Sequence, residues 1–147
     1  MDVGSSDSIN MYQAFVNIRY EYTCSLFCYQ INAYLQEVAL NYPQLVTLQT
    51  IGQSYEGRDM IVIKISSGGN GNRPVVLVDG GIHAREWVAP AMTLYIINQL
   101  VENNAANRNL TDAVDWYILP VLNPDGYEYS HTNVSEIYSH PLHTNDS

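Results

Sequence analysis

A short, uninterrupted apolar run is the feature that most constrains the fold of this chain. The four residues Val75-Val76-Leu77-Val78 are followed at once by Asp79-Gly80-Gly81 and then by a helical pattern that begins near Trp87. Strands in which every residue is apolar are typical of sheets that are covered on both faces. The run and the helix after it therefore predict an α/β protein, with residues 75–78 as a strand buried on both faces.

Periodicity predicts the other elements. Apolar residues recur at helical spacing from Tyr29 to Asn41, and Pro43 disfavours any continuation of that helix. Strands are predicted at 45–51 and 60–65, a short helix at 109–114, and a central, mostly apolar strand at 115–122. Strands and helices in this order predict an α/β fold with a mixed sheet and helices on both faces.

Size and charge exclude several classes of function. The 147 residues, of which 46% are apolar, suffice for one domain with a real core. Six basic and 15 acidic residues give a net charge of −9. Because phosphate groups are bound by Lys and Arg, we expect no nucleic-acid partner and no membrane partner. No segment has the run of apolar residues that a membrane span needs.

The pattern divides the chain into three segments. Residues 1–28 are irregular, residues 29–130 hold the predicted elements, and residues 131–147 are predicted to form a disordered tail, with irregular sequence already from Tyr127. The polar, acidic start is unlike a signal peptide, so we expect none in this chain. Cys24 and Cys28 are expected to be small buried side chains, because no other Cys or His lies nearby in the sequence to complete a zinc site.

Candidate metal ligands lie where the apolar strand gives way to the helix. His83 and Glu86 are three residues apart, so one helical turn would place an imidazole and a carboxylate on the same side. Both groups are zinc ligands, and sites in α/β sheets lie at the carboxyl ends of strands. A solvated histidine followed by a glutamate at a helix N-terminus would give the same pattern. A catalytic zinc site needs about three protein ligands, and the other histidines, expected to be solvated, are His131, His140 and His143.

Three motif-bearing segments follow one another along the chain. The first is Ile51 to Arg58, the second is Gly81-Ile82-His83-Ala84-Arg85-Glu86-Trp87 with Pro90-Ala91, and the third is Leu119 to Tyr127. In order and spacing they resemble the zinc metallocarboxypeptidases of the carboxypeptidase A/B type, and the second resembles the zinc-binding segment of that family. The similarity runs from about Ile31 to His131. It implies the N-terminal half of a zinc-carboxypeptidase-like catalytic domain, and thus an incomplete one.

The resemblance implies a function and roles for three residues. The family releases C-terminal amino acids from peptides and proteins by zinc-dependent hydrolysis. His83 and Glu86 match its first two ligands to one zinc ion, and Arg85 matches an arginine that contacts the substrate. The resemblance further implies peptide or protein C-termini as partners and an extracellular, secreted location. We also expect a monomer.

Parts of the family's site have no counterpart in these 147 residues. They are the third zinc ligand, the general-base glutamate, and the Asn-Arg pair that binds the substrate carboxylate. Residues 134–138 also stand where the family has a basic stretch that contains an arginine. We therefore expect no catalytic general base here, and a truncated form that binds zinc weakly and hydrolyses nothing. Two alternatives stay open: a catalytically dead homologue that binds or inhibits, and a zinc acylase or deacylase of the same fold.

Overall fold

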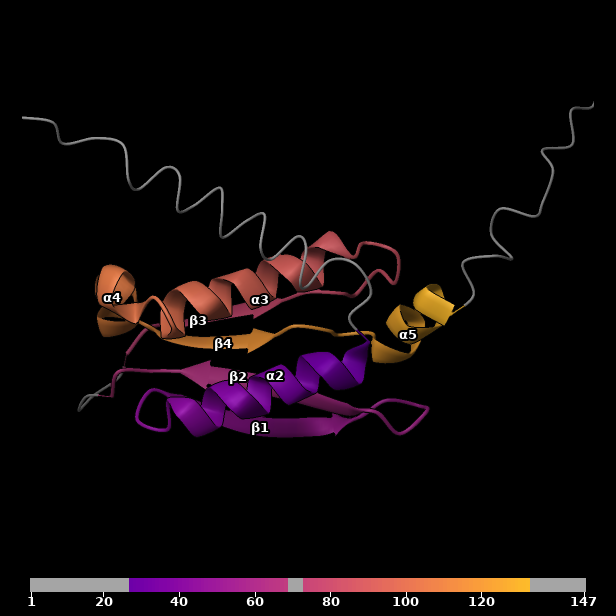
Figure 1. The fold of residues 1–147 in the computed structure, drawn as a ribbon, viewed down its shortest axis with the longest axis horizontal. Coiled ribbons are helices and arrows are strands. Elements are labelled where there is room, and N and C mark those ends of the chain that lie inside the picture. The colour runs from indigo at the N-terminus through magenta and orange to yellow at the C-terminus, as the bar shows by residue number, and fades with distance from the viewer. Residues whose placement is uncertain (1–26, 69–72, 133–147) are drawn as a thin grey trace, which may run out of the picture.

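A computed structural model describes residues 27–68 and 73–132 (Figure 1). Its elements, in chain order, are α2 (Cys28–Asn41), β1 (Val46–Gln53), β2 (Asp59–Ile65), β3 (Val75–Asp79), α3 (Val88–Val101), α4 (Asn104–Ala113), β4 (Asp115–Leu119) and α5 (Pro124–Thr132). The predicted first helix and first three strands agree with α2, β1, β2 and β3 to within two residues. The short helix predicted at 109–114 is longer, and the last strand ends before Pro120.

The four strands form one mixed sheet in the order β1-β2-β4-β3. The β1–β2 and β2–β4 pairs are antiparallel, and β3 runs parallel to β4. Ile118 of β4 pairs with Ile63 on one side and with Val78 on the other. The predicted mixed sheet is therefore confirmed, and β4 lies inside it as expected.

The hydrophobic core lies on one face of this sheet. Ile63, Ile65 and Ile118 are fully buried and belong to a single core cluster. Alternate residues of a strand point to the same face, so these side chains mark the face that is covered. Leu35 of α2 and Ile97 of α3 belong to the same cluster. Both long helices therefore pack on this face, and in Figure 1 both lie in front of the strands.

The other face of the sheet is more open in the described residues. On β3, Val75 is 60% exposed and Leu77 is 69% exposed. The prediction that this strand is buried on both faces is therefore wrong. Two features explain this exposure of Val75 and Leu77: β3 lies at one end of the strand order, and α2 and α3 both pack on the opposite face of the sheet. Of the predicted mixed sheet with helices on both faces, the described residues show the mixed sheet and one covered face.

Helix α5 corrects the predicted extent of the tail. The sequence from Tyr127 was expected to be irregular, but residues 127–132 are helical. Tyr127 and Ser130 are each 3% exposed. The stripe of buried residues was missed because it is narrow and ends in a polar side chain. Residues 133–147 and nearly all of the predicted segment 1–28 lie outside the described residues. Within the described ranges, every helix is too short or too polar to cross a membrane.

Candidate metal-binding loop

The two candidate ligands lie in the loop that connects β3 to α3. Because β3 and β4 are parallel, this loop starts at the carboxyl edge of the pair, where sites in α/β sheets are found. His83, Arg85 and Glu86 are all exposed. The Glu86 backbone N–H donates to the His83 carbonyl at 3.1 Å and closes a turn. Helix α3 begins only at Val88, so a hydrogen-bonded turn ahead of the helix, and not the predicted helical turn, joins His83 and Glu86.

The first half of the loop is hydrogen-bonded to the end of β4 and the residues that follow it. The Gly80 N–H donates to the Leu119 carbonyl at 3.0 Å, and the Leu122 N–H donates back to Gly80 at 2.8 Å. The Asn123 N–H donates to the Gly81 carbonyl at 3.1 Å. These bonds continue the β3–β4 pairing beyond Asp79, so the backbone that leads into His83 is held on the sheet.

The two glycines at the start of the loop meet different requirements. A Cβ on Gly80 would lie 2.9 Å from both the Pro120 carbonyl oxygen and the Thr93 methyl group. Gly81 has a φ of +65°, which is rare for residues with a side chain. The crowding at Gly80 involves Pro120 and Thr93, so it depends on how distant parts of the chain pack against the loop.

The second half of the loop is held by α5. The Trp87 Nε1–H donates to the Ser130 hydroxyl at 2.9 Å, and the same oxygen lies 2.9 Å from the Ala84 carbonyl. The Trp87 ring also stacks on His131, with 4.3 Å between ring centroids and 24° between planes. His131 was expected to be a solvated tail residue, and this is wrong, because it is half-buried on α5 beside the loop.

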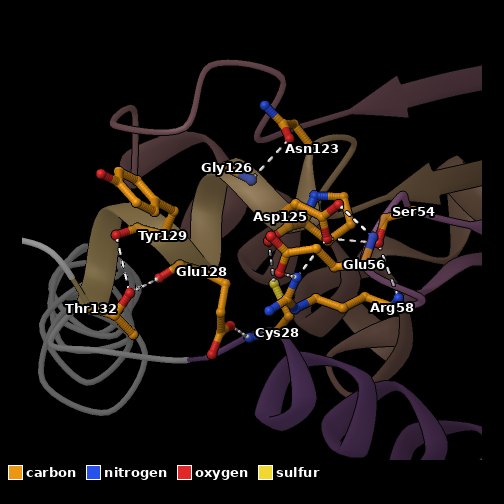
Figure 2. A network of polar contacts seen from close by, with 11 residues as sticks. Cys28, Ser54, Glu56, Arg58, Asn123, Asp125, Gly126, Glu128, Tyr129 and Thr132 are labelled. Carbon is orange, nitrogen blue, oxygen red and sulfur yellow. Dashed lines mark hydrogen bonds and ion pairs between the residues drawn. The ribbon is translucent and has the colours of Figure 1, made fainter.

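The start of α5 is tied to the β1–β2 hairpin by the Asp125 carboxylate (Figure 2). Asp125 accepts hydrogen bonds from the Ser54 hydroxyl at 2.6 Å, the Arg58 guanidinium at 2.6 Å and the Glu56 N–H at 3.0 Å. The hydrogen bond from Ser54, and then that from Arg58, lowers the pKa of Asp125. Because α5 carries Ser130 and His131, this anchor also fixes the support of the loop.

Helix α5 also contacts the start of α2, which Figure 2 shows beside the carboxylate of Glu128. The Cys28 N–H donates to Glu128 at 3.2 Å. Burial, and then the charge of Glu128, raises the pKa of the Cys28 thiol to about 12. Cys28 is 7% exposed, which confirms the prediction of a small buried side chain. Cys24 lies outside the described residues.

The residues of the loop fit part of a zinc site. An imidazole and a carboxylate, both exposed and one turn apart, are donors of the kind that zinc takes. Within residues 27–68 and 73–132, no three His, Cys, Asp or Glu side chains are grouped to hold a metal ion. The described part of the loop therefore offers two of the protein ligands that a zinc ion needs, His83 and Glu86. His140 and His143 lie outside the described residues.

The comparisons place this chain beside zinc carboxypeptidases. A family model described as zinc carboxypeptidase matches residues 31–145. Carboxypeptidase B of Astacus astacus is 44% identical over 104 residues, which cover 71% of this chain and 34% of that protein. Zinc carboxypeptidase A 1 of Drosophila melanogaster is 46% identical over 105 residues, or 68% of this chain and 24% of that protein. The crystal structure of carboxypeptidase A from Helicoverpa armigera matches with a TM-score of 0.68 and 32% identity, covering 84% of this chain and 33% of that chain. The chain thus spans about a quarter to a third of these relatives.

Proposed function

Because this chain belongs to the zinc carboxypeptidase family, we propose that its function is the zinc-dependent release of C-terminal amino acids from peptides and proteins, for which these residues provide part of the site. One observation carries the proposal. The loop Gly80–Trp87 presents His83 and Glu86 one turn apart on an exposed surface, at the carboxyl edge of the parallel pair. An extracellular location is part of the same proposal, and detection of the natural protein in the culture medium of its cells would test it.

We propose that His83 and Glu86 hold one zinc ion through an imidazole nitrogen and a carboxylate oxygen. A zinc ion bound there supplies a Lewis acid and lowers the pKa of a bound water. The chain contributes a loop that is already held in place: backbone hydrogen bonds join it to residues 119–123, and Ser130 of α5 bonds to the Ala84 carbonyl and to the Trp87 side chain. Ligands on a backbone that is already fixed lose less entropy when they bind.

Arg85 is proposed to bind the peptide substrate. It stands between the two ligands in sequence, and its side chain is exposed. A guanidinium offers five N–H donors in a planar fork, which suits carbonyl and carboxylate oxygens of a peptide. Its position in the loop therefore fits contact with substrate beside the metal.

Titration of the purified chain with Zn²⁺ tests the ligand assignment. The variants His83→Ala and Glu86→Gln should each lose most of the zinc affinity, because each removes one of two donors. The matched control is Arg85→Ala, which changes an exposed residue of the same loop and should bind zinc like the wild type. Equal affinities for the wild type and both ligand variants would contradict the assignment.

We propose that these 147 residues on their own hydrolyse no peptide bond. The reason is chemical: the described residues offer two ligands, whereas a catalytic zinc site has about three and an open position for water. Incubation of the zinc-loaded chain with a model peptide, followed by mass spectrometry, should reveal no loss of the C-terminal residue. Release of that residue would overturn the proposed inactivity while supporting the family activity.

A further inference from the structure

A single hydroxyl on α5 contacts the metal-binding loop on both sides of Glu86. Ser130 is 3% exposed, and its Oγ lies 2.9 Å from both the Trp87 Nε1 and the Ala84 carbonyl oxygen. Ala84 and Trp87 flank the Arg85-Glu86 pair in the sequence. We propose that Ser130 is a positioning residue, which fixes the loop backbone that carries the ligands. This inference rests on the proposed zinc site.

The chemistry of the groups assigns the direction of these bonds. An indole N–H can only donate, so Ser130 accepts the hydrogen bond from Trp87. A hydroxyl has one proton to give. Two carbonyl oxygens compete for it, that of Ala84 at 2.9 Å and that of Tyr127, on α5 itself, at 2.7 Å. The hydrogen bond from Trp87 to Ser130 therefore has no competitor, whereas the Ser130 proton is divided between the carbonyl oxygens of Ala84 and Tyr127.

His131 restrains the same indole through its ring face. The two rings stack at 4.3 Å, and the His131 Nδ1 lies 2.8 Å from the Tyr127 carbonyl oxygen. Because a carbonyl only accepts, this nitrogen carries the proton, and the bond fixes the orientation of the imidazole ring. Trp87 is thus held by stacking and by its N–H. Only the hydrogen bond depends on Ser130.

The contact acts on Glu86 through the backbone. Glu86 is exposed, so the packing of its own side chain contributes little to its direction. Metal sites lose about 10–100-fold in affinity when a group that orients a ligand is removed. Ser130 acts through the neighbouring residues, so we expect a loss at the lower end of that range, about 10-fold.

Two measurements on the 147-residue chain test this role. Zn²⁺ affinity is measured for the wild type, Ser130→Ala and Ser130→Thr, the last of which keeps a hydroxyl. Thr111→Val is the matched control, because Thr111 is also buried and its hydroxyl also accepts one bond and donates one, but on α4. The indole N–H resonances are then compared by NMR. The Trp116 N–H, bonded to the Leu110 carbonyl at 3.2 Å, serves as the internal reference.

The proposal expects about 10-fold weaker zinc binding in Ser130→Ala, with recovery in Ser130→Thr and wild-type affinity in Thr111→Val. The Trp87 resonance should shift in Ser130→Ala while that of Trp116 stays in place. Trp87→Phe, which keeps the stacking on His131, should weaken zinc binding to a similar degree and repeats the test should Ser130→Ala fail to fold.

The outcomes separate the two proposals. If the wild type binds zinc and Ser130→Ala binds it equally well, the positioning role is wrong and the zinc site stands. A loss in Thr111→Val as large as that in Ser130→Ala also overturns the positioning role, because the effect is then one of general stability. If the wild type binds no zinc, the proposed function fails and the positioning role fails with it.

Discussion

Replacing Gly57, Gly80 and Gly81 by alanine, one at a time, separates two reasons for a glycine. Gly57 has a φ of +79° and nothing within 4 Å of an added Cβ, so its substitution measures backbone strain alone. At Gly80 the φ is not in the left-handed region, and the Cβ would lie 2.9 Å from two atoms. Gly81 combines a φ of +65° with contacts of 3.2–3.3 Å. The three variants thus test strain, crowding and both together.

The structure sets the expected order of the losses in stability. A residue with a Cβ at positive φ costs about 1–2 kcal/mol, and the lower entropy of the unfolded alanine chain offsets about 0.5 kcal/mol. Gly57→Ala should therefore cost about 1 kcal/mol. Overpacking costs about 1–3 kcal/mol. Gly80→Ala should lie near the upper end, because the Pro120 and Ala89 carbonyls that meet the Cβ are backbone. Gly81→Ala, with strain and milder contacts, should cost about 2 kcal/mol.

Urea denaturation followed by circular dichroism measures these losses, with equal m-values as the condition for comparing midpoints. Zinc titration supplies the second measurement. Gly80 and Gly81 lead into the ligand loop, so their variants should also bind zinc more weakly, whereas Gly57→Ala should not. A Gly80→Ala variant that is as stable as the wild type, or less affected than Gly57→Ala, would refute the steric reasoning.

Two further predictions concern titratable groups. Hydrogen bonds from Ser54 and then Arg58 lower the pKa of Asp125. The ionised carboxylate therefore stabilises the fold at any pH above its ordinary pKa of about 3.9. This contribution to stability is lost as the pH falls through the lowered pKa. In urea titrations, the difference in the free energy of unfolding between the wild type and Asp125→Asn should be constant above about pH 5 and should become smaller in more acidic solution. A difference that does not change with pH would contradict the role given to Asp125. Burial raises the pKa of Cys28 to about 12, so iodoacetamide at about pH 8 should label it only after unfolding in urea, as measured by peptide mass spectrometry. Labelling of the native chain at the rate found in urea would contradict this.

Several parts of the fold and site were open to prediction because they are local. The helical spacing from Tyr29 predicted α2, since a period of 3.6 follows from backbone geometry, and the short uninterrupted apolar run at 75–78 predicted β3. The separation of His83 and Glu86 likewise depends on one turn of chain. The motif segments also predicted the family, which the comparison confirms.

The missed features depend on the fold as a whole. The apolar run at 75–78 is the same in an interior strand and in a strand at the end of the sheet, so its exposure had to come from the strand order. The pattern of α5 was weak because three of its nine residues are buried. Its first turn is hydrogen-bonded through Asp125 to Ser54 and Arg58, partners that are distant in the sequence.

The amino-acid sequence alone determined most of the helices and strands, with α5 as the exception, and the separation of His83 and Glu86 along the chain, because these depend on the covalent geometry of neighbouring residues. The tertiary structure decided what supports them. Ser130 reaches Trp87 across 43 residues of chain, and Ser54 reaches Asp125 across 71. Such partners meet only after the sheet and helices have packed, so no local spacing encodes them.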